Sequence, residues 1–176
     1  VMGKTSAFKS LYSADFPHAE DYELWVRLER NGFKLANIPL VLLRYRCHPG
    51  QVSSKLKNIQ KNSAEVVRRL QLRRIGFSSN KDKDYLETLQ IGRMANDEIL
   101  PLSNWVNRLV LENRKQQVFS PPYLEAELRI KFEQLIYNQP ISSQVIIAII
   151  DSLVLDELLL RRIKRYLSFK IKQRLK

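Results

Sequence analysis

The pattern of apolar residues changes near Ser53 and Ser54, and this change limits most strongly what the chain can fold into. Residues 1–54 mix short helical and strand patterns and hold three of the five glycines, whereas helical periodicity interrupted by prolines dominates residues 55–176. The sequence therefore predicts an α/β domain part over residues 1–54, followed by a mainly α-helical extension over residues 55–176. The chain as a whole is expected to be predominantly α-helical.

In the first part, the pattern predicts one short helix and two strands. Apolar residues between Asp21 and Asn31 recur at helical spacing, and Gly32 follows where a helix often ends in a left-handed residue. Segments 34–38 and 40–48 have strand patterns. In the second segment one face, which we expect to be the core face, would be apolar, and the opposite face would carry Leu42, Arg44, Arg46 and His48.

Six helices are expected in the second part, near residues 57–75, 82–94, 103–115, 122–138, 142–157 and 158–175. Asp82 and Ser103 are suitable N-cap residues, and Gly76 is a suitable C-terminal stop. Apolar stripes at helical spacing usually form a core, so Trp105 and its apolar neighbours are expected to support the fold.

Composition places the chain in the globular class and leaves its partners open. Of its 176 residues 44% are apolar, and the formal charge of +12 would attract nucleic acid, anionic lipid or phosphorylated ligands alike. The single cysteine, Cys47, rules out an internal disulfide and fits a reducing compartment, so we expect the cytoplasm. No signal peptide is predicted at Val1, and the charge-free stretch 141–150 is far shorter than the roughly 20 residues that span a bilayer.

The C-terminal segment from Leu158 to Lys176 combines positive charge with an apolar stripe. It holds eight basic residues and no acidic residue, and the stripe runs from Leu160 to Leu175. Such a basic amphipathic helix can lie on an anionic membrane, which would place the protein peripherally at the inner face of the cell membrane. The same stripe would equally serve to pack the helix against its own domain.

The most specific motifs lie between Phe16 and Gly50. The acidic pair Glu20-Asp21 opens the expected helix, and Arg27 follows within it; segments 36–39 (Ala-Asn-Ile-Pro) and 45–48 (Tyr-Arg-Cys-His) come next. In these motifs and their order, residues 1 to about 54 resemble the C-terminal, acceptor-side part of a family-two, GT-A-type glycosyltransferase. The resemblance implies a Rossmann-like fragment for these residues. It extends more loosely over the helical part, which is similar to the tail of bacterial enzymes thought to build surface polysaccharides.

The resemblance also implies roles for three residues. Asp21 would be the general base that takes the proton of the acceptor hydroxyl, Glu20 would contact the acceptor, and His48 would help to hold a divalent metal ion, Mn or Mg. The strand alternation places Arg46 on the same face as His48, where Arg46 could meet the diphosphate of the donor. A carboxylate at a helix N-terminus is kept ionised by the helix dipole, which suits a base. The alternatives are that Glu20 and Asp21 are ordinary N-terminal helix carboxylates and that His48 is structural or solvent-exposed.

A complete enzyme of this kind has a donor-binding half that ends in an acidic Asp-x-Asp motif. We assign no Asp-x-Asp of this sequence to that role, because residues 82–84 (Asp-Lys-Asp) lie in the helical part and have the pattern of a helix start. We therefore expect the isolated chain to be an inactive part of an enzyme that transfers a sugar from a nucleotide-sugar donor to a glycan or lipid-linked acceptor in surface polysaccharide synthesis. One alternative is a non-catalytic, membrane-associated interaction module. A less favoured alternative is a basic helical nucleic-acid-binding protein. It is supported by the charge of +12 and by six basic residues: Lys55, Lys57, Arg68, Arg69, Arg73 and Arg74. It leaves the motifs of residues 20–48 unexplained, so no specific nucleic acid is expected.

Overall fold

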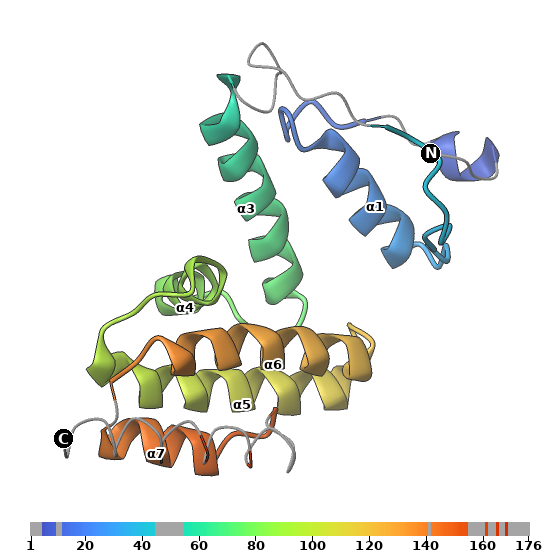
Figure 1. Ribbon diagram of the computed structural model, residues 1–176. Coiled ribbons are helices and arrows are strands. Elements are labelled where there is room, and N and C mark those ends of the chain that lie inside the picture. The colour runs from blue at the N-terminus through green and yellow to red at the C-terminus, as the bar shows by residue number, and fades with distance from the viewer. Residues whose placement is uncertain are drawn as a thin grey trace. The chain divides into compact units, whose positions relative to one another are not determined.

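The structure, a computed structural model, describes residues 5–9, 12–44, 55–140 and 142–154, together with residues 161, 165 and 168. The chain divides into two compact units, residues 1–71 and 72–176. Within the described ranges every regular element is a helix (Figure 1). The expected α/β fragment of a GT-A, Rossmann-like domain is therefore wrong, and the described part of the chain is helical. The domain boundary expected near residue 54 stays a prediction, because residues 45–54 lie outside the described ranges.

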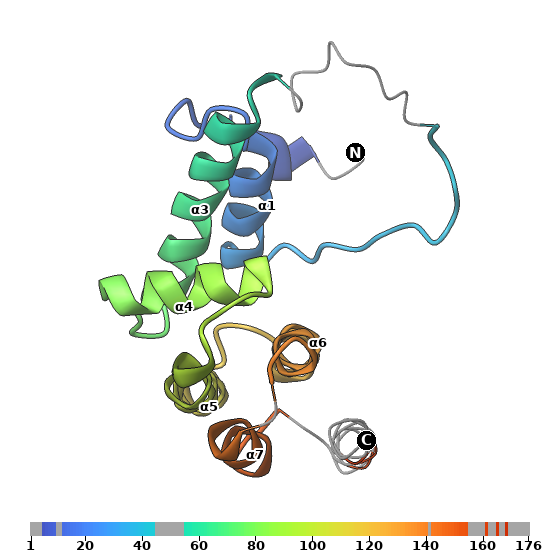
Figure 2. The ribbon, with the colours of Figure 1, turned by 60° about the vertical axis from the view of Figure 1, so that its left-hand side comes forward.

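The first unit contains a short 3-10 helix and α-helices that pack a small apolar cluster. Its elements are η1 (Thr5–Lys9), α1 (Glu20–Arg30) and most of α3 (Lys57–Arg73). Leu24 and Leu28 lie one turn apart on α1 and are buried together with Ala7 of η1, and two partly buried aromatic residues, Trp25 and Phe33, pack against them. Helices α1 and α3 lie side by side (Figure 2).

Helix α1 ends as the sequence predicts. Gly32 has φ +82°, and its N–H donates to the carbonyl of Glu29 while the N–H of Phe33 donates to the carbonyl of Leu28. This pair of bonds is the Schellman motif, in which a left-handed residue satisfies the last carbonyls of a helix. Phe33 also packs against the cluster that contains Leu28, which is the apolar contact that accompanies the motif.

The two strands expected after α1 are absent from the described residues 33–44. The chain from residue 34 to residue 44 is irregular, and a backbone bond there runs from the N–H of Leu40 to the carbonyl of Ile38. Val41 is 93% exposed and Leu43 is 78% exposed, so the face expected to be core is in solvent. A strand needs a neighbour to accept its backbone hydrogen bonds, and the described residues supply none. The apolar pattern predicted a strand, but the missing partner decides against it.

The second unit is built around one central helix. Helix α5 (Ile99–Gln116) contacts α4 (Asn80–Ile91), η2 (Asn96–Glu98), α6 (Pro121–Tyr137) and α7 (Ser143–Ile150). Its buried residues recur every three or four positions, as an amphipathic helix requires, and they begin at Ile99 and end at Asn113. Trp105 is buried in the apolar core around α5, as expected. The centroid of its ring lies 5.6 Å from that of Phe77 and 5.7 Å from that of Tyr85.

Polar side chains in the second unit join the ends of its helices. The buried amide of Asn113 accepts a 2.8 Å bond from the N–H of Phe119 and donates a 3.0 Å bond to its carbonyl, which fixes the turn between α5 and α6. In the same way Asn107 bonds the carbonyl of Asp151 and the N–H of Leu153, just after α7. These bonds satisfy backbone groups in the segments that follow α5 and α7.

Several helix limits differ from the expected ones. Helix α5 begins at Ile99 rather than at residue 103, because η2 leads directly into it and Pro101 is tolerated in the first turn. Ser103 is therefore not an N-cap; it is buried, and its hydroxyl donates to the carbonyl of Ala148. Helix α7 ends at Ile150 instead of continuing to residue 157. The basic helix expected over residues 158–175 lies outside the described residues, apart from positions 161, 165 and 168.

Gly76 was predicted to end a helix and Asp82 to be the N-cap of the next one, and the structure confirms only the first prediction. Gly76 has φ +84° and forms the same Schellman bonds after α3 as Gly32 forms after α1, which confirms it as a helix stop. The N-cap of α4 is Ser79, and Asp82 is its partner in a capping box, three residues later. Asp82 thus marks the start of a helix without being its N-cap.

Candidate functional site

The first turn of α1 holds three carboxylates, Glu20, Asp21 and Glu23, and the last turn holds Arg27 and Arg30. The positive end of the helix dipole stabilises acidic residues in the first turn, and the negative end stabilises basic residues in the last turn. This arrangement strengthens a helix of only 11 residues. It also gathers the two predicted acceptor-side residues, Glu20 and Asp21, at one helix end.

A tight turn leads into this helix. The N–H of Ala19 donates to the carbonyl of Phe16, with Pro17 and His18 at the two central positions and His18 at φ +64°. Proline at the second position and a positive φ at the third are the features of a type II turn, and histidine tolerates that region better than most residues. His18 therefore contributes to this turn through its backbone.

The turn positions the carboxylate of Glu20. The N–H of His18 donates a 3.0 Å hydrogen bond to Glu20 Oε1. Bonds from backbone N–H groups, its own first and then that of His18, hold the pKa of Glu20 below its usual value. Glu20 is thus an ionised acceptor whose orientation is fixed by the turn before it.

Asp21 differs from Glu20 in its exposure. Its side chain lies in solvent, and Oδ1 accepts a 2.7 Å bond from the N–H of Tyr22. A general base must come within hydrogen-bond reach of the proton that it removes, which an exposed carboxylate at a helix end allows. The structure therefore places Asp21 where a substrate can reach it.

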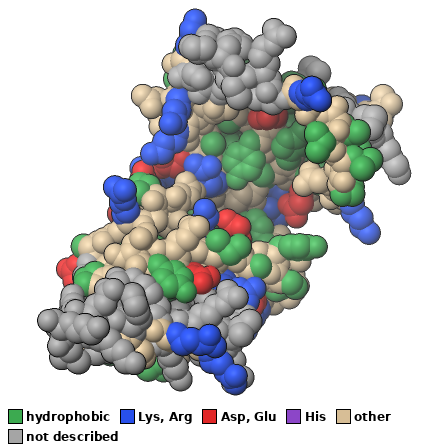
Figure 3. Space-filling view, in the orientation of Figure 1, with side chains coloured by type: hydrophobic (Ala, Val, Ile, Leu, Met, Phe, Trp, Pro, Cys, Tyr) green, Lys and Arg blue, Asp and Glu red, His purple; other side chains and the backbone are tan. Residues whose placement is uncertain are grey.

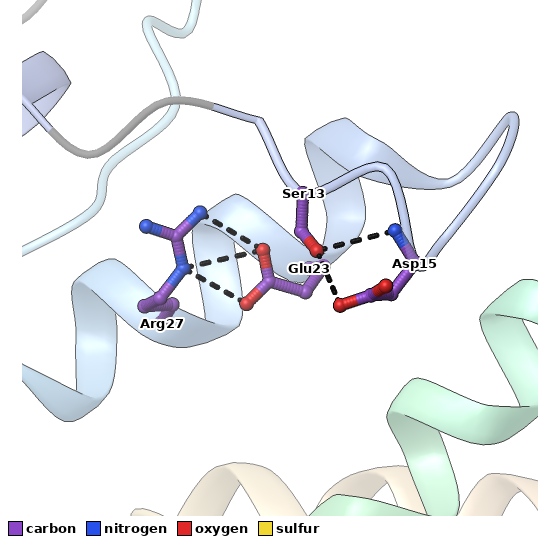
Figure 4. Close-up of polar contacts among 4 residues, drawn as sticks. All are labelled: Ser13, Asp15, Glu23 and Arg27. Atoms are coloured by element: carbon purple, nitrogen blue, oxygen red, sulfur yellow. Dashed lines mark hydrogen bonds and ion pairs between the residues drawn. The ribbon is translucent and has the colours of Figure 1, made fainter.

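Glu23 and Arg27 form a two-pronged ion pair one helical turn apart (Figure 4). Nε of Arg27 lies 2.9 Å from Oε1 of Glu23, and an amino nitrogen of Arg27 lies 3.0 Å from Oε2. The i, i+4 spacing predicts such a pair, although the sequence motif singled out Arg27 alone. Figure 4 also shows the preceding loop, in which the hydroxyl of Ser13 donates to Asp15 Oδ2.

Two of the four predicted site residues, Arg46 and His48, lie outside the described residues. Their distance from Asp21 therefore stays a prediction. Among the residues that the structure describes, no group of three His, Cys, Asp or Glu side chains could hold a metal ion. The described side chains thus do not form a metal centre by themselves.

Comparison with known proteins gives one partial relative to report. Over 61 residues the chain is 39% identical to a protein of Haemophilus influenzae strain Rd named an uncharacterized glycosyltransferase. The chain is glycosyltransferase-like. The match covers 35% of this chain and 19% of that protein, so the chain spans about a fifth of the relative's length. No protein-family model matches the chain, and no solved structure matches it.

Proposed function

We propose that this chain is the acceptor-side part of a glycosyltransferase, which moves a sugar from a nucleotide-sugar donor to a glycan or lipid-linked acceptor. The single observation that supports the proposal most is the first turn of α1, where an exposed Asp21 adjoins an oriented Glu20. The partial identity to a glycosyltransferase supports the reaction class. The motif resemblance supports a role in surface polysaccharide synthesis.

In the proposed reaction the carboxylate of Asp21 removes the proton of an acceptor hydroxyl. The hydroxyl oxygen then forms a bond to the anomeric carbon of the donor sugar, and the nucleoside diphosphate leaves with the electrons of the broken bond. Glu20 accepts a hydrogen bond from a second acceptor hydroxyl and so fixes the acceptor in place. Its own orientation comes from the N–H of His18.

The donor side of the reaction rests on residues outside the described ranges. Arg46 is proposed to meet the donor diphosphate, and His48 is proposed to help hold a divalent metal ion. A divalent Mn or Mg ion would need ligands besides His48, because the described residues hold no group that could bind it. We assign no step of the transfer to that ion.

The test requires a form of the protein that carries a donor-binding half together with this segment. Asp21→Asn is expected to lower the transfer rate by about 10²–10⁴-fold while donor affinity stays near that of the wild type, because a base acts on the acceptor. The matched control is Asp84→Asn, which changes an exposed aspartate of α4 in the other unit and is expected to keep the wild-type rate. Wild-type transfer by the Asp21 variant would remove Asp21 as the base. The isolated 176-residue chain is expected to be inactive.

The high positive charge needs a separate account. Figure 3 shows Lys and Arg side chains scattered over the visible face, including along α3, among acidic and apolar ones. Because charge alone does not choose a partner and we recognise no DNA- or RNA-binding motif in the sequence, we propose no nucleic-acid partner. No helix among the described residues is long and apolar enough to cross a bilayer. We propose a cytoplasmic protein that contacts the inner face of the membrane peripherally.

A further inference from the structure

Helix α7 has apolar residues on both of its faces. Its inner face is buried in the core of the second unit through Val145, Ala148 and Ile149. Its outer face exposes three isoleucines, Ile146, Ile147 and Ile150. A helix that is apolar all round is normally covered on every side by protein or by lipid. The outer face of α7 is therefore suited to a partner that excludes water.

The exposed apolar surface continues beyond the end of the helix. Leu153 is also exposed, and its N–H donates a 2.8 Å bond to Asn107 Oδ1, while the amide of Asn107 donates a 2.7 Å bond to the carbonyl of Asp151. These bonds hold the turn after α7 against α5, and α7 lies on the side of α5 away from α4 (Figures 1 and 2). We name this exposed surface the α7 patch; it consists of Ile146, Ile147, Ile150 and Leu153. Contiguous exposed apolar side chains of this kind mark interaction surfaces.

The charges around the α7 patch indicate the chemistry of its partner. Between residues 134 and 155 the only charged residue is Asp151. Residues 151–176 hold eight basic against three acidic residues, a net charge of +5, and Arg161 and Arg165 among them are exposed. An uncharged apolar patch followed by excess positive charge complements a surface that offers both apolar and anionic groups. An anionic lipid bilayer is such a surface.

The patch and the basic segment can reach the same bilayer. A fully extended chain spans at most about 3.6 Å per residue, so Arg161 lies within roughly 29 Å of Leu153. Both belong to the second unit. One weak membrane signal gives only marginal, reversible binding, and stable attachment requires a second. The basic segment supplies the electrostatic signal, and the α7 patch would supply the apolar one.

We propose that the α7 patch inserts into an anionic bilayer while the basic segment 158–176 holds it at the headgroups. This inference rests on the proposed peripheral membrane contact and names the surface that makes it. Interfacial helices of this kind enter only about 5–10 Å, as far as the boundary between headgroups and acyl chains. The protein would thereby be brought to the surface at which a lipid-linked acceptor is presented.

The first experiment measures binding of the 176-residue chain to vesicles made of equal parts of phosphatidylglycerol and phosphatidylcholine. Ile147→Gln combined with Ile150→Gln is expected to weaken binding about tenfold or more, because two apolar side chains no longer leave water. The matched control combines Ile91→Gln with Ile130→Gln, the same changes at exposed isoleucines of α4 and α6, and should stay within about twofold of the wild type. Wild-type binding by the α7 variant, equal losses in both variants, or no binding by the wild type would overturn the proposal.

A second readout follows insertion directly. Ile150→Cys, in a chain whose single Cys47 is replaced by serine, carries an environment-sensitive fluorophore, and Asp84→Cys on α4 is the exposed control. Anionic vesicles should shift the emission of the label at position 150 to the blue, and brominated lipid should quench it, whereas the label at position 84 should stay in water. If residues 158–176 cover the α7 patch instead, the label at position 150 is shielded before vesicles are added and does not change. That result would overturn the proposal.

Vesicle binding and sugar transfer are measured independently, so the two proposals can fail separately. Full transfer by Asp21→Asn together with vesicle binding that depends on Ile147 and Ile150 would remove the base and leave the membrane surface. A defective Asp21→Asn variant together with undiminished vesicle binding by the α7 variant would leave the base and remove the α7 patch.

Discussion

Asp82 and Trp105 are joined across 23 positions of the sequence by a 2.7 Å hydrogen bond from the indole Nε1 to Oδ1 of the carboxylate. The same oxygen accepts a bond from Arg108, and Oδ2 accepts bonds from the hydroxyl and the backbone N–H of Ser79. One buried carboxylate therefore connects the N-terminus of α4 to the middle of α5. This makes Asp82 a structural centre of the second unit.

Asp82→Ala is expected to lower the free energy of unfolding by about 2–4 kcal/mol. Loss of the capping box accounts for about 1 kcal/mol of this, and leaving the buried indole N–H of Trp105 without an acceptor accounts for about 1–3 kcal/mol. Asp84→Ala, which changes an exposed aspartate on the same helix, is the control and should cost under about 0.5 kcal/mol. Urea unfolding followed by circular dichroism measures both, and equal losses would show that the Asp82 bonds contribute little.

The pH dependence of stability should report on the same carboxylate. Burial would raise the pKa of Asp82, but bonds from Ser79 and Trp105 and the charge of Arg108 outweigh it and hold the pKa below its usual value. A lowered pKa in the folded state means that this stabilisation is present above about pH 4 and is lost as the pH falls further. The stability difference between the wild type and Asp82→Asn should therefore shrink below about pH 4. A difference that stays constant on acidification would contradict this assignment.

Helix α1 shows what the sequence could predict about the fold. Helical spacing of Leu24 and Leu28, together with Gly32 at the C′ position, correctly predicted a helix that ends in a left-handed residue. These signals are local, because each depends on residues within one or two turns. Segment 40–44 shows the opposite case, since a strand depends on a distant partner that no local pattern reveals.

The candidate site likewise has one part that the sequence predicts and another that only the structure shows. The pairing of Glu20 with Asp21 at a helix N-terminus follows from the sequence, whereas the turn that fixes Glu20 through the His18 N–H needed the structure. The packing of Ala7 of η1 against Leu24 and Leu28 of α1 was likewise not predictable from spacing. Contacts between helices depend on how the chain returns after a loop, and short-range periodicity carries no information about that.

Gly76 offers a test of the helix stop that the sequence predicted. An added Cβ would meet no atom within 4 Å, so the cost of Gly76→Ala is the cost of placing alanine at φ +84°. We expect a loss of about 1–2 kcal/mol in the free energy of unfolding. Gly76→Asn is the matched variant, and it should lose less because asparagine tolerates the left-handed region. If alanine and asparagine cost the same, a cause other than backbone conformation would be needed.

Residues 35–43 are expected to be the first site of cleavage by thermolysin, which cuts before large apolar residues. Val41 is 93% exposed, whereas Val110 in α5 is fully buried and serves as the internal control. Exposed irregular segments enter a protease site readily, and helical segments in a core must first unfold. Mass spectrometry of early fragments identifies the cut. If thermolysin cuts before Val41 as slowly as before Val110, this segment pairs as a strand, as the sequence pattern predicted.

The last prediction concerns the basic segment 158–176, whose proposed role is to hold the protein reversibly at an anionic membrane. Each cation near such a surface contributes about 1 kcal/mol before salt screening, so co-sedimentation with vesicles should require anionic lipid and should weaken as salt is added. Reversing two exposed charges, with Arg161→Glu and Arg165→Glu, should reduce pelleting strongly, while the single reversal Arg73→Glu in α3 should reduce it only slightly. Equal pelleting with neutral and anionic vesicles, or none with either, would show that the apolar stripe packs against the chain's own helices.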